Sequence, residues 1–207
     1  MTGEFVIFKY LNAMKVDFDF FKIHSKIAPQ KGRIIVSEPF LPGNFFSRSA
    51  VLLVDYSAKG AVGFILNKPF ETPINELFSD FPDYTTEVYV GGPVGNDSLF
   101  YIHTLGDRIK GCVNVKGELY WGGDFEELKS VIAAGKVEPN QVKFFVGYSG
   151  WSAGQLDNEI TENSWLVTEA DTKQIMKSNQ NFWLESVKNA GGHYKTWRSF
   201  PEDPNSN

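Results

Sequence analysis

The chain alternates short apolar runs with turn-forming residues, a pattern typical of β-strands joined by tight loops. Two pairs of runs are separated by connections short enough for hairpins, SAKG at residues 57–60 and KG at residues 116–117. The predicted strands are residues 32–38, 49–56, 61–66, 87–90, 99–103, 111–115, 118–121, 142–148 and 165–167. The run at residues 142–148 is apolar enough to predict a buried strand.

Other segments carry apolar residues at helical spacing. They begin at Pro73, at Asp124, near Ser152 and at Asp171, and the last is predicted to be the longest helix, running to about Asn189. Asp124 and Ser152 are each followed three residues later by Glu or Gln, which is the spacing of a capping box. Because hairpins and helices are interspersed and no regular βαβ series occurs, the predicted fold class is α+β.

Length and composition favour one domain with a sheet-rich core. The 207 residues are enough to bury a core without disulfides, and 18 Phe, 8 Tyr and 5 Trp supply large side chains suited to strands. The chain contains no internal repeat and no long linker. We therefore predict an N-terminal extension over residues 1–27, a single domain over residues 28–204 and a polar tail over residues 205–207.

Charge and cysteine content disfavour several functional classes. The net charge is −5 and no basic cluster is dense enough for a DNA-binding arm. The single cysteine, Cys112, cannot form an internal disulfide and is predicted to be a buried filler, while His24, His103 and His193 lack the spacing of a zinc site. We therefore expect no metal and no cofactor. Charged residues interrupt every apolar run near the N-terminus, so neither a signal peptide nor a membrane span is predicted, and we interpret the protein as cytoplasmic.

The stretch FFVGYSGWSAGQ at residues 144–155 raises the question of a catalytic serine. Ser149 lies between a predicted strand and a predicted helix, as does the serine of a G-x-S-x-G nucleophile elbow. The last glycine of that pattern is replaced by Trp151, whose indole would force the two elements apart. Ser149, then Asp157 or Asp171, then His193 follow the order of a hydrolase triad, so a serine hydrolase using Ser149 and His193 is kept as an alternative. The favoured interpretation is a crowded strand-to-helix corner relieved by glycines.

Several segments together resemble the AlgH/YqgE family of bacterial proteins. They are GRIIVSEPFLPGNFFSRSAVLLVDY, GAVGFILNKP, VYVGGPVGND, YIHTLGD, and FFVGYSGWSAGQLDNEI with NSWLV soon after it. The similarity runs from about Lys31 to Pro204. It implies a soluble, intracellular, single-domain α+β protein, with a bent mixed or antiparallel sheet partly closed into a barrel-like form and flanking helices. It implies no known reaction, since members are usually labelled uncharacterised, or transcriptional regulators by association with alginate regulation.

The resemblance also marks individual positions. Those that match the family pattern are Pro39, Phe45, Arg48, Asn67, Gly91, Gly92, Pro93, His103, Gly147, Trp151, Gly154, Gln155, Leu156, Glu159 and Trp165. The family usually carries alanine where this chain has Ser149, which argues against a catalytic hydroxyl. We interpret GGPVGND, at residues 91–97, as a turn rather than an anion site, and His103 as a hydrogen-bonded structural residue.

Polar residues of the predicted helix after Ser152 suggest a binding groove. Gln155 and Glu159 are four residues apart on one helix face, with Trp151 at its head. Arg48 and Asn67 opposite them would complete a groove for a small ligand or a protein partner, in which Arg48 either clamps a carboxylate or phosphate or pairs with Glu159. We therefore predict a non-catalytic binding or regulatory module, acting on transcription indirectly. A direct DNA-binding regulator is a further alternative, which the acidic charge disfavours.

Overall fold

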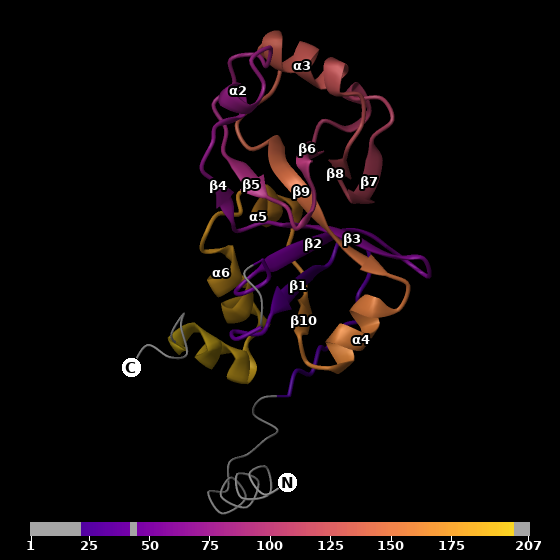
Figure 1. Cartoon of the computed structure of the whole chain (residues 1–207), viewed down its shortest axis with the longest axis vertical. Helices are drawn as coiled ribbons and strands as arrows, with labels where there is room; N and C mark the ends of the chain where they lie inside the picture. The colour runs from indigo at the N-terminus through magenta and orange to yellow at the C-terminus, as the bar shows by residue number, and fades with distance from the viewer. Residues whose placement is uncertain (1–21, 42–44, 201–207) are drawn as a thin grey trace, which may run out of the picture.

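The computed structural model describes residues 22–41 and 45–200, and most of the predicted extension and tail lies outside them (Figure 1). The strands are β1 (Ile34–Ser37), β2 (Ala50–Ser57), β3 (Gly60–Ile65), β4 (Pro69–Phe70), β5 (Val88–Val90), β6 (Val94–His103), β7 (Val113–Lys116), β8 (Leu119–Trp121), β9 (Val142–Ser152) and β10 (Trp165–Thr168). The helices are α2 (Ile74–Leu77), α3 (Phe125–Ala133), α4 (Gln155–Thr161), α5 (Thr172–Met176) and α6 (Phe182–Ala190), with 3-10 segments η2 (Gly106–Arg108) and η3 (Gly192–Ser199). Each predicted strand overlaps an observed one, and the α+β class is confirmed.

The strands form one ten-stranded sheet, with β9 at its centre. The order is β10-β1-β2-β3-β9-β6-β8-β7, while β5 pairs with β9 in parallel and β4 pairs with β5. The other pairings are antiparallel. The path has two different ends, β10 and β7, so the described sheet is open and the barrel-like closure is not confirmed.

Side chains of the sheet alternate between separate hydrophobic clusters. On β1, Ile34 and Val36 pack into the cluster that α6 covers, whereas Ile35 packs into the cluster that α4 covers. Figure 1 shows α4 and α6 on opposite sides of β1 and β10, with α2 and α3 at the other end of the molecule. There α2 and α3 cover a further cluster that includes Phe144 of β9. The strand β9 thus contributes to the core at both ends of the molecule.

The described part of the predicted N-terminal extension contacts the domain. The backbone N–H of Ile23 donates to Asn163 Oδ1 at 2.8 Å, and Ser25 Oγ accepts from the Val167 N–H of β10 at 2.8 Å. Ile23 and Ile27 pack against clusters on the two faces of the sheet. Residues 22–27 therefore lie along the outer edge of β10 and satisfy one of its free backbone donors.

The predicted corner at Ser149 is wrong. Strand β9 continues through Ser152, because residues 149–152 pair with Gly60–Gly63 of β3. The chain turns only at Gly154, whose φ of 73° is left-handed, and α4 then begins at Gln155. Half of the predicted capping box is present, since Gln155 Oε1 accepts from the Ser152 N–H at 3.0 Å.

The prediction of one long helix from Asp171 to Asn189 is also wrong. The chain forms α5, capped by Asp171 and Gln174 in a capping box, then leaves the helix at Lys177 and resumes as α6. The break contains Ser178 and Asn179, whose short polar side chains compete with helical hydrogen bonding. It also frees the Ser178 carbonyl for contacts with the sheet.

Candidate functional site

The two glycine motifs of the sequence pack against each other backbone to backbone. A Cβ added to Gly91 would lie 2.2 Å from the Gly147 carbonyl oxygen, and one added to Gly92 would lie 2.3 Å from the carbonyl of Tyr148. Gly92 and Gly147 also have left-handed φ values of 155° and 69°. The motifs GGP and GYS therefore share one structural cause, the close approach of the segment after β5 to β9.

Ser149 lies inside this contact. Its side chain is fully buried, and its Oγ donates to the Gly91 carbonyl oxygen at 3.0 Å. A nucleophile must be reachable by its substrate and hydrogen-bonded to a base. His193, the proposed base, lies in η3 with its ring 4.1 Å from that of Tyr194. The structure gives no support to the hydrolase alternative.

Three of the five predicted groove residues meet in one hydrogen-bonded cluster. Glu159 Oε2 accepts from the indole N–H of Trp151 at 2.9 Å and from that of Trp165 at 2.8 Å. Glu159 Oε1 accepts from Gln155 Nε2 at 2.9 Å. Both indoles are buried, and the ring of Phe46 stacks on Trp151 and meets Trp165 edge to face. Glu159 thus satisfies the polar atoms of two core tryptophans.

The other two predicted residues lie on the opposite face of the sheet, beside α6. The amide of Asn67 accepts from the Ala50 N–H and donates to the Arg48 carbonyl oxygen, both at 2.9 Å. The Arg48 guanidinium lies 5.0 Å from the Trp183 ring centroid and donates to the Phe200 carbonyl at 2.5 Å. Arg48 and Asn67 line a cavity of about 460 Å³. The structure therefore brings three of the five predicted groove residues together and places Arg48 and Asn67 across the sheet from them.

The remaining motif positions occupy turns and the core. Pro39 is buried in a turn closed by the Leu41 N–H and the Glu38 carbonyl at 3.3 Å, and Pro93 lies between Gly92 and β6.

His103 is fully buried, with Nδ1 accepting from the Leu105 N–H at 3.2 Å. Its Nε2 therefore carries the proton and donates to the Gly122 carbonyl at 3.1 Å. Burial lowers the pKa of His103, which favours this neutral form.

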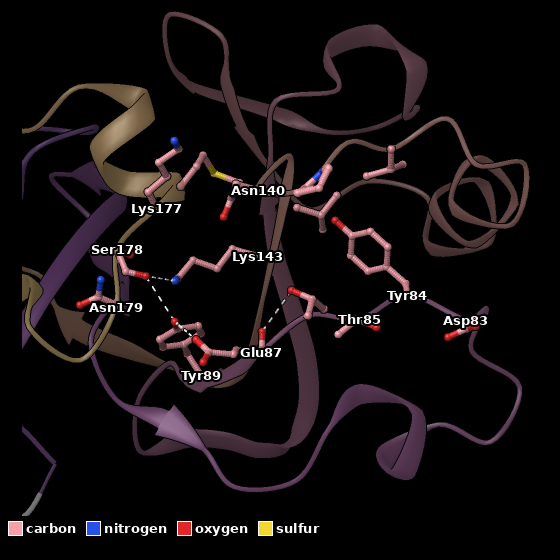
Figure 2. Close-up of a pocket in the computed structure, with 15 residues that line it drawn as sticks. Asp83, Tyr84, Thr85, Glu87, Tyr89, Asn140, Lys143, Lys177, Ser178 and Asn179 are labelled. Atoms are coloured by element: carbon pink, nitrogen blue, oxygen red, sulfur yellow. Dashed lines mark hydrogen bonds between the residues drawn. The ribbon is translucent and has the colours of Figure 1, made fainter.

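Lys143 of β9, which the sequence pattern did not single out, projects into a cavity. Its side chain is only 4% exposed, and its Nζ donates to the Ser178 carbonyl at 2.6 Å (Figure 2). The Nζ also lies 3.4 Å from the centroid of the Tyr89 ring, a cation–π distance. The Tyr89 hydroxyl donates to Glu87 Oε2 at 2.5 Å and lies 3.3 Å from the same Ser178 carbonyl.

We call this space, of about 540 Å³, the Lys143 cavity. Its lining residues come from β5 and the segment before it, from the start of β9 and the loop before it, and from the end of α5 and the break that follows. They are Asp83, Tyr84, Thr85, Thr86, Glu87, Tyr89, Val137, Pro139, Asn140, Val142, Lys143, Met176, Lys177, Ser178 and Asn179. Figure 2 shows the Lys143 side chain reaching across the cavity between Ser178 and Tyr89.

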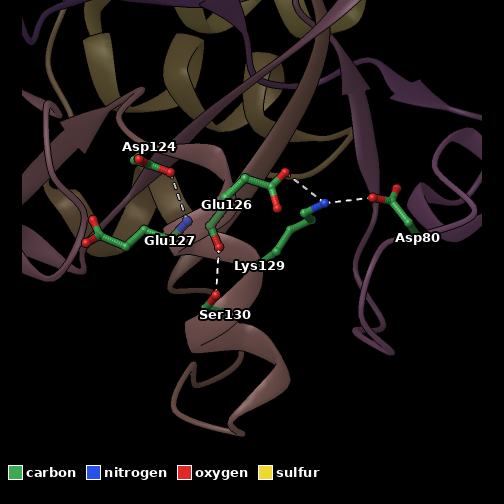
Figure 3. Close-up of polar contacts among 6 residues, drawn as sticks. All are labelled: Asp80, Asp124, Glu126, Glu127, Lys129 and Ser130. Atoms are coloured by element: carbon green, nitrogen blue, oxygen red, sulfur yellow. Dashed lines mark hydrogen bonds and ion pairs between the residues drawn. The ribbon is translucent and has the colours of Figure 1, made fainter.

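Burial lowers the pKa of Lys143 to about 7, and the nearby Glu87 carboxylate only partly offsets this effect. Lys129 of α3 illustrates the opposite case (Figure 3). Its Nζ lies 2.7 Å from an Asp80 carboxylate oxygen and 2.9 Å from one of Glu126, and the Asp80 hydrogen bond raises its pKa. Lys143 is held instead by a neutral carbonyl and an aromatic face, so its charged form is less well compensated than that of Lys129.

Within residues 22–41 and 45–200, no group of three His, Cys, Asp or Glu side chains could hold a metal ion. Over the same residues, none of the helices has the length and apolar character that crossing a membrane requires. Cys112 is half-buried, and its thiol donates to the Gly106 carbonyl at 3.4 Å.

A family model described as AlgH-like matches residues 34–195. The chain belongs to the AlgH-like family. A UPF0301 protein of Parabacteroides distasonis is 42% identical over 188 residues, covering 89% of this chain and 95% of the relative. Another UPF0301 protein, from Bacteroides thetaiotaomicron, is 39% identical over 198 residues, covering 94% and 100%. The family resemblance of the sequence is thereby confirmed.

Two solved structures have the same fold. The solution structure of the AlgH protein from Pseudomonas aeruginosa has a TM-score of 0.66 and 26% identity, over 81% of this chain and 92% of that one. A crystal structure of a Corynebacterium diphtheriae protein has a TM-score of 0.71 at 20% identity, over 89% and 98%, and supports the fold alone. None of these names states a reaction or a ligand.

One sequence signal could have revealed the Lys143 cavity in this AlgH-like chain. The run VKFFV places a lysine inside an apolar strand that was itself predicted to be buried. Strand alternation puts Lys143 on the same face as Phe145, which is fully buried. A lysine on the core side of a buried strand needs a compensating environment or a cavity. The partners Tyr89 and Ser178 could not have been identified, because they depend on the three-dimensional fold.

Proposed function

We propose that this AlgH-like protein is a non-catalytic binding module with a regulatory role, and that its ligand occupies the Lys143 cavity. One observation carries the proposal: a lysine that is 4% exposed faces a polar cavity of about 540 Å³ and is held by a neutral carbonyl. Burying an amine in this way opposes folding, and groups that oppose folding concentrate at functional sites. The cavity is also large enough for a small metabolite.

The chemistry of the cavity favours a small polar ligand. Hydroxyl and amide groups of Thr85, Thr86, Asn140 and Asn179 line it and offer hydrogen bonds of both kinds. Lys143 supplies a donor at its inner end. A ligand with several hydroxyl or carbonyl oxygens fits this lining better than an extended apolar molecule would.

The contact between Lys143 and Ser178 supports the proposed regulatory role. This hydrogen bond joins β9 to the break between α5 and α6, and Ser178 Oγ in turn donates to the Leu66 carbonyl at 3.3 Å. A ligand that takes the Lys143 amine as its own partner competes with the Ser178 carbonyl. The bound and free states then differ in how firmly the α5–α6 break is held, which a protein partner can recognise. Such action on transcription is indirect, in keeping with the net charge of −5.

The proposal can be tested with amide NMR spectra of the purified protein. The panel contains glycolaldehyde, pyruvate, glucose 6-phosphate and glutamate, each titrated into wild type, Lys143→Met and the surface control Lys110→Met. We expect at least one compound to give saturable shifts concentrated at residues 83–89, 140–143 and 176–179, in wild type and the control. These shifts should vanish in Lys143→Met. Saturable shifts elsewhere, shifts that survive Lys143→Met, or no response to any compound would each count against the Lys143 cavity as the binding site.

A further inference from the structure

Lys143 has the surroundings of an amine that reacts with carbonyl compounds. Its Nζ ends inside a cavity, lies against the face of Tyr89, and is held by the Ser178 carbonyl rather than by a carboxylate. Burial of this amine without a carboxylate bonded to it favours the neutral form, which is the nucleophilic form of lysine. Since the pKa of Lys143 is lowered to about 7, a large share of this side chain is neutral at physiological pH.

We propose that Lys143 forms a reversible imine with the carbonyl carbon of a small hydroxylated aldehyde bound in the Lys143 cavity. This inference rests on the proposed binding function and names the class of its ligand. The hydroxyl groups of such an aldehyde match the side chains of Thr85, Thr86, Asn140 and Asn179. Its small size suits an amine that is almost fully buried and is reached through the cavity.

Carbon dioxide is the other small electrophile that a neutral lysine captures, and the charges around Lys143 disfavour it. A carbamate is an anion, and it would lie beside the Glu87 carboxylate and over the negative face of the Tyr89 ring. A protonated imine is a cation. It keeps the favourable contact with the ring and is attracted by Glu87.

The bonding changes are balanced without an external oxidant or reductant. The Nζ lone pair forms a bond to the aldehyde carbon, the C=O π electrons move to oxygen, and a proton passes from Nζ to that oxygen to give a carbinolamine. The nitrogen lone pair then forms the C=N bond while the C–O bond breaks and the oxygen leaves with a second proton as water. The protonated imine returns that proton when it loses its remaining N–H proton. The sum is one amine plus one aldehyde giving one imine plus one water, and added water reverses it. The Tyr89 hydroxyl, paired with Glu87 and 3.3 Å from the carbonyl that holds Nζ, is placed to exchange the proton with the leaving oxygen.

The experiment is reductive trapping with glycolaldehyde as the probe. The protein is incubated at pH 7.5 with glycolaldehyde and sodium cyanoborohydride, whose hydride fixes an imine as a stable secondary amine. Intact mass and peptide mapping then locate the adduct. At this pH about three quarters of an amine with a pKa near 7 is neutral, against about 0.1% of an ordinary lysine. We therefore expect one adduct on Lys143, formed on the order of a hundredfold faster than on any surface lysine.

Variants separate the site from general lysine reactivity. Lys143→Arg and Lys143→Met should lose the fast adduct, while Lys110→Met should retain it. Thr85→Trp narrows the cavity mouth and leaves the amine in place, so it should slow trapping at least tenfold while the protein stays folded by its amide spectrum. This variant keeps the test valid even if the replacements of Lys143 do not fold.

The outcomes distinguish this inference from the proposed function. Adducts spread evenly over surface lysines would overturn the imine, and so would carbon-13 bicarbonate labelling Lys143 as a carbamate in place of the aldehyde adduct. If glycolaldehyde shifts the cavity amides without a trapped adduct, the binding function stands and the imine is wrong. If ethylene glycol, which has no carbonyl, reproduces the shifts of glycolaldehyde at equal concentration, the carbonyl is not the recognised group and the imine is likewise wrong.

Discussion

Replacing Lys143 with methionine should stabilise the protein at neutral pH, by an amount that falls as the pH rises. Methionine has a similar volume and no charge to bury. The Ser178 carbonyl loses its Lys143 donor, because the Tyr89 hydroxyl donates its single proton to Glu87, and this loss costs about 1–3 kcal/mol at every pH. The stabilisation comes from removing the cost of burying a charged amine.

The magnitude follows from the pKa of Lys143 in the two states. The folded value is about 7 and the unfolded value is about 10.5, so the unfolded chain binds more protons between these two pH values. Below pH 7 both states are protonated and the full cost of about 5 kcal/mol applies. Above pH 7 the folded state sheds its proton first, and the wild type gains stability. Between pH 7 and pH 9 this gain amounts to about 2 kcal/mol.

The assay is urea unfolding of wild type and Lys143→Met at pH 7, 8 and 9, followed by tryptophan fluorescence. The free energy of unfolding of the wild type, minus that of the variant, should rise by about 2 kcal/mol over this range. Other titrating groups, such as Tyr101 with its pKa raised to about 12, are present in both proteins and largely cancel. A difference that stays constant from pH 7 to pH 9 would show that Lys143 titrates as an ordinary lysine, and the reasoning about its burial would fail.

Four further substitutions test these structural roles, the first two by urea unfolding and the two glycine replacements by circular dichroism. Ser149→Ala removes a buried hydrogen bond to the Gly91 carbonyl, which also accepts from the Ile65 N–H. The free energy of unfolding should therefore fall by only about 1 kcal/mol. A larger loss would contradict the role of Ser149 as one of two donors to this carbonyl. Glu159→Ala leaves two buried indole N–H groups without their acceptor. It should lower the free energy of unfolding by about 2–5 kcal/mol and change the tryptophan fluorescence markedly. An unchanged fluorescence spectrum would refute the cluster. Gly92→Ala places a Cβ 2.3 Å from the Tyr148 carbonyl and should prevent folding. The control Gly111→Ala has nothing within 4 Å of its new Cβ. It should lower the free energy of unfolding by about 1 kcal/mol, through its positive φ alone. Equal behaviour of the two alanine variants, judged by circular dichroism, would argue against the backbone contact.

The local pattern of the sequence was sufficient for most strands and for helix α3. The hairpin of β2 and β3 and that of β7 and β8 form where short connections separate apolar runs. Helix α3 begins after Asp124, which accepts from the Glu127 N–H at 2.9 Å as the spacing predicts. These features depend on neighbours in sequence, so patterns of alternation and capping are enough to find them.

The errors arise where contacts distant in sequence decide the local structure. The segment 149–152 looked like a corner because it contains Ser149, Gly150 and a bulky indole, but pairing with β3 keeps it extended. The segment 171–189 has helical periodicity throughout, yet it breaks where the Ser178 carbonyl meets Lys143, which lies 35 positions away in the chain. Tertiary contacts of this kind override local propensity and leave no trace in the periodicity.

Lys143, which carries the proposed site, differs in physical character from the positions that match the family pattern. Gly91, Gly92 and Gly147 are explained by the space between two backbones, and Glu159 is explained by the indoles it bonds, so folding alone accounts for them. Lys143 is different, because the fold would gain stability from an apolar side chain at the same place. A family signature read as a list of active residues would therefore point to the glycine contact and to the cluster around Glu159. Lys143 is the buried group that the fold does not need. It lies near the other end of the same strand, β9, and projects into the Lys143 cavity.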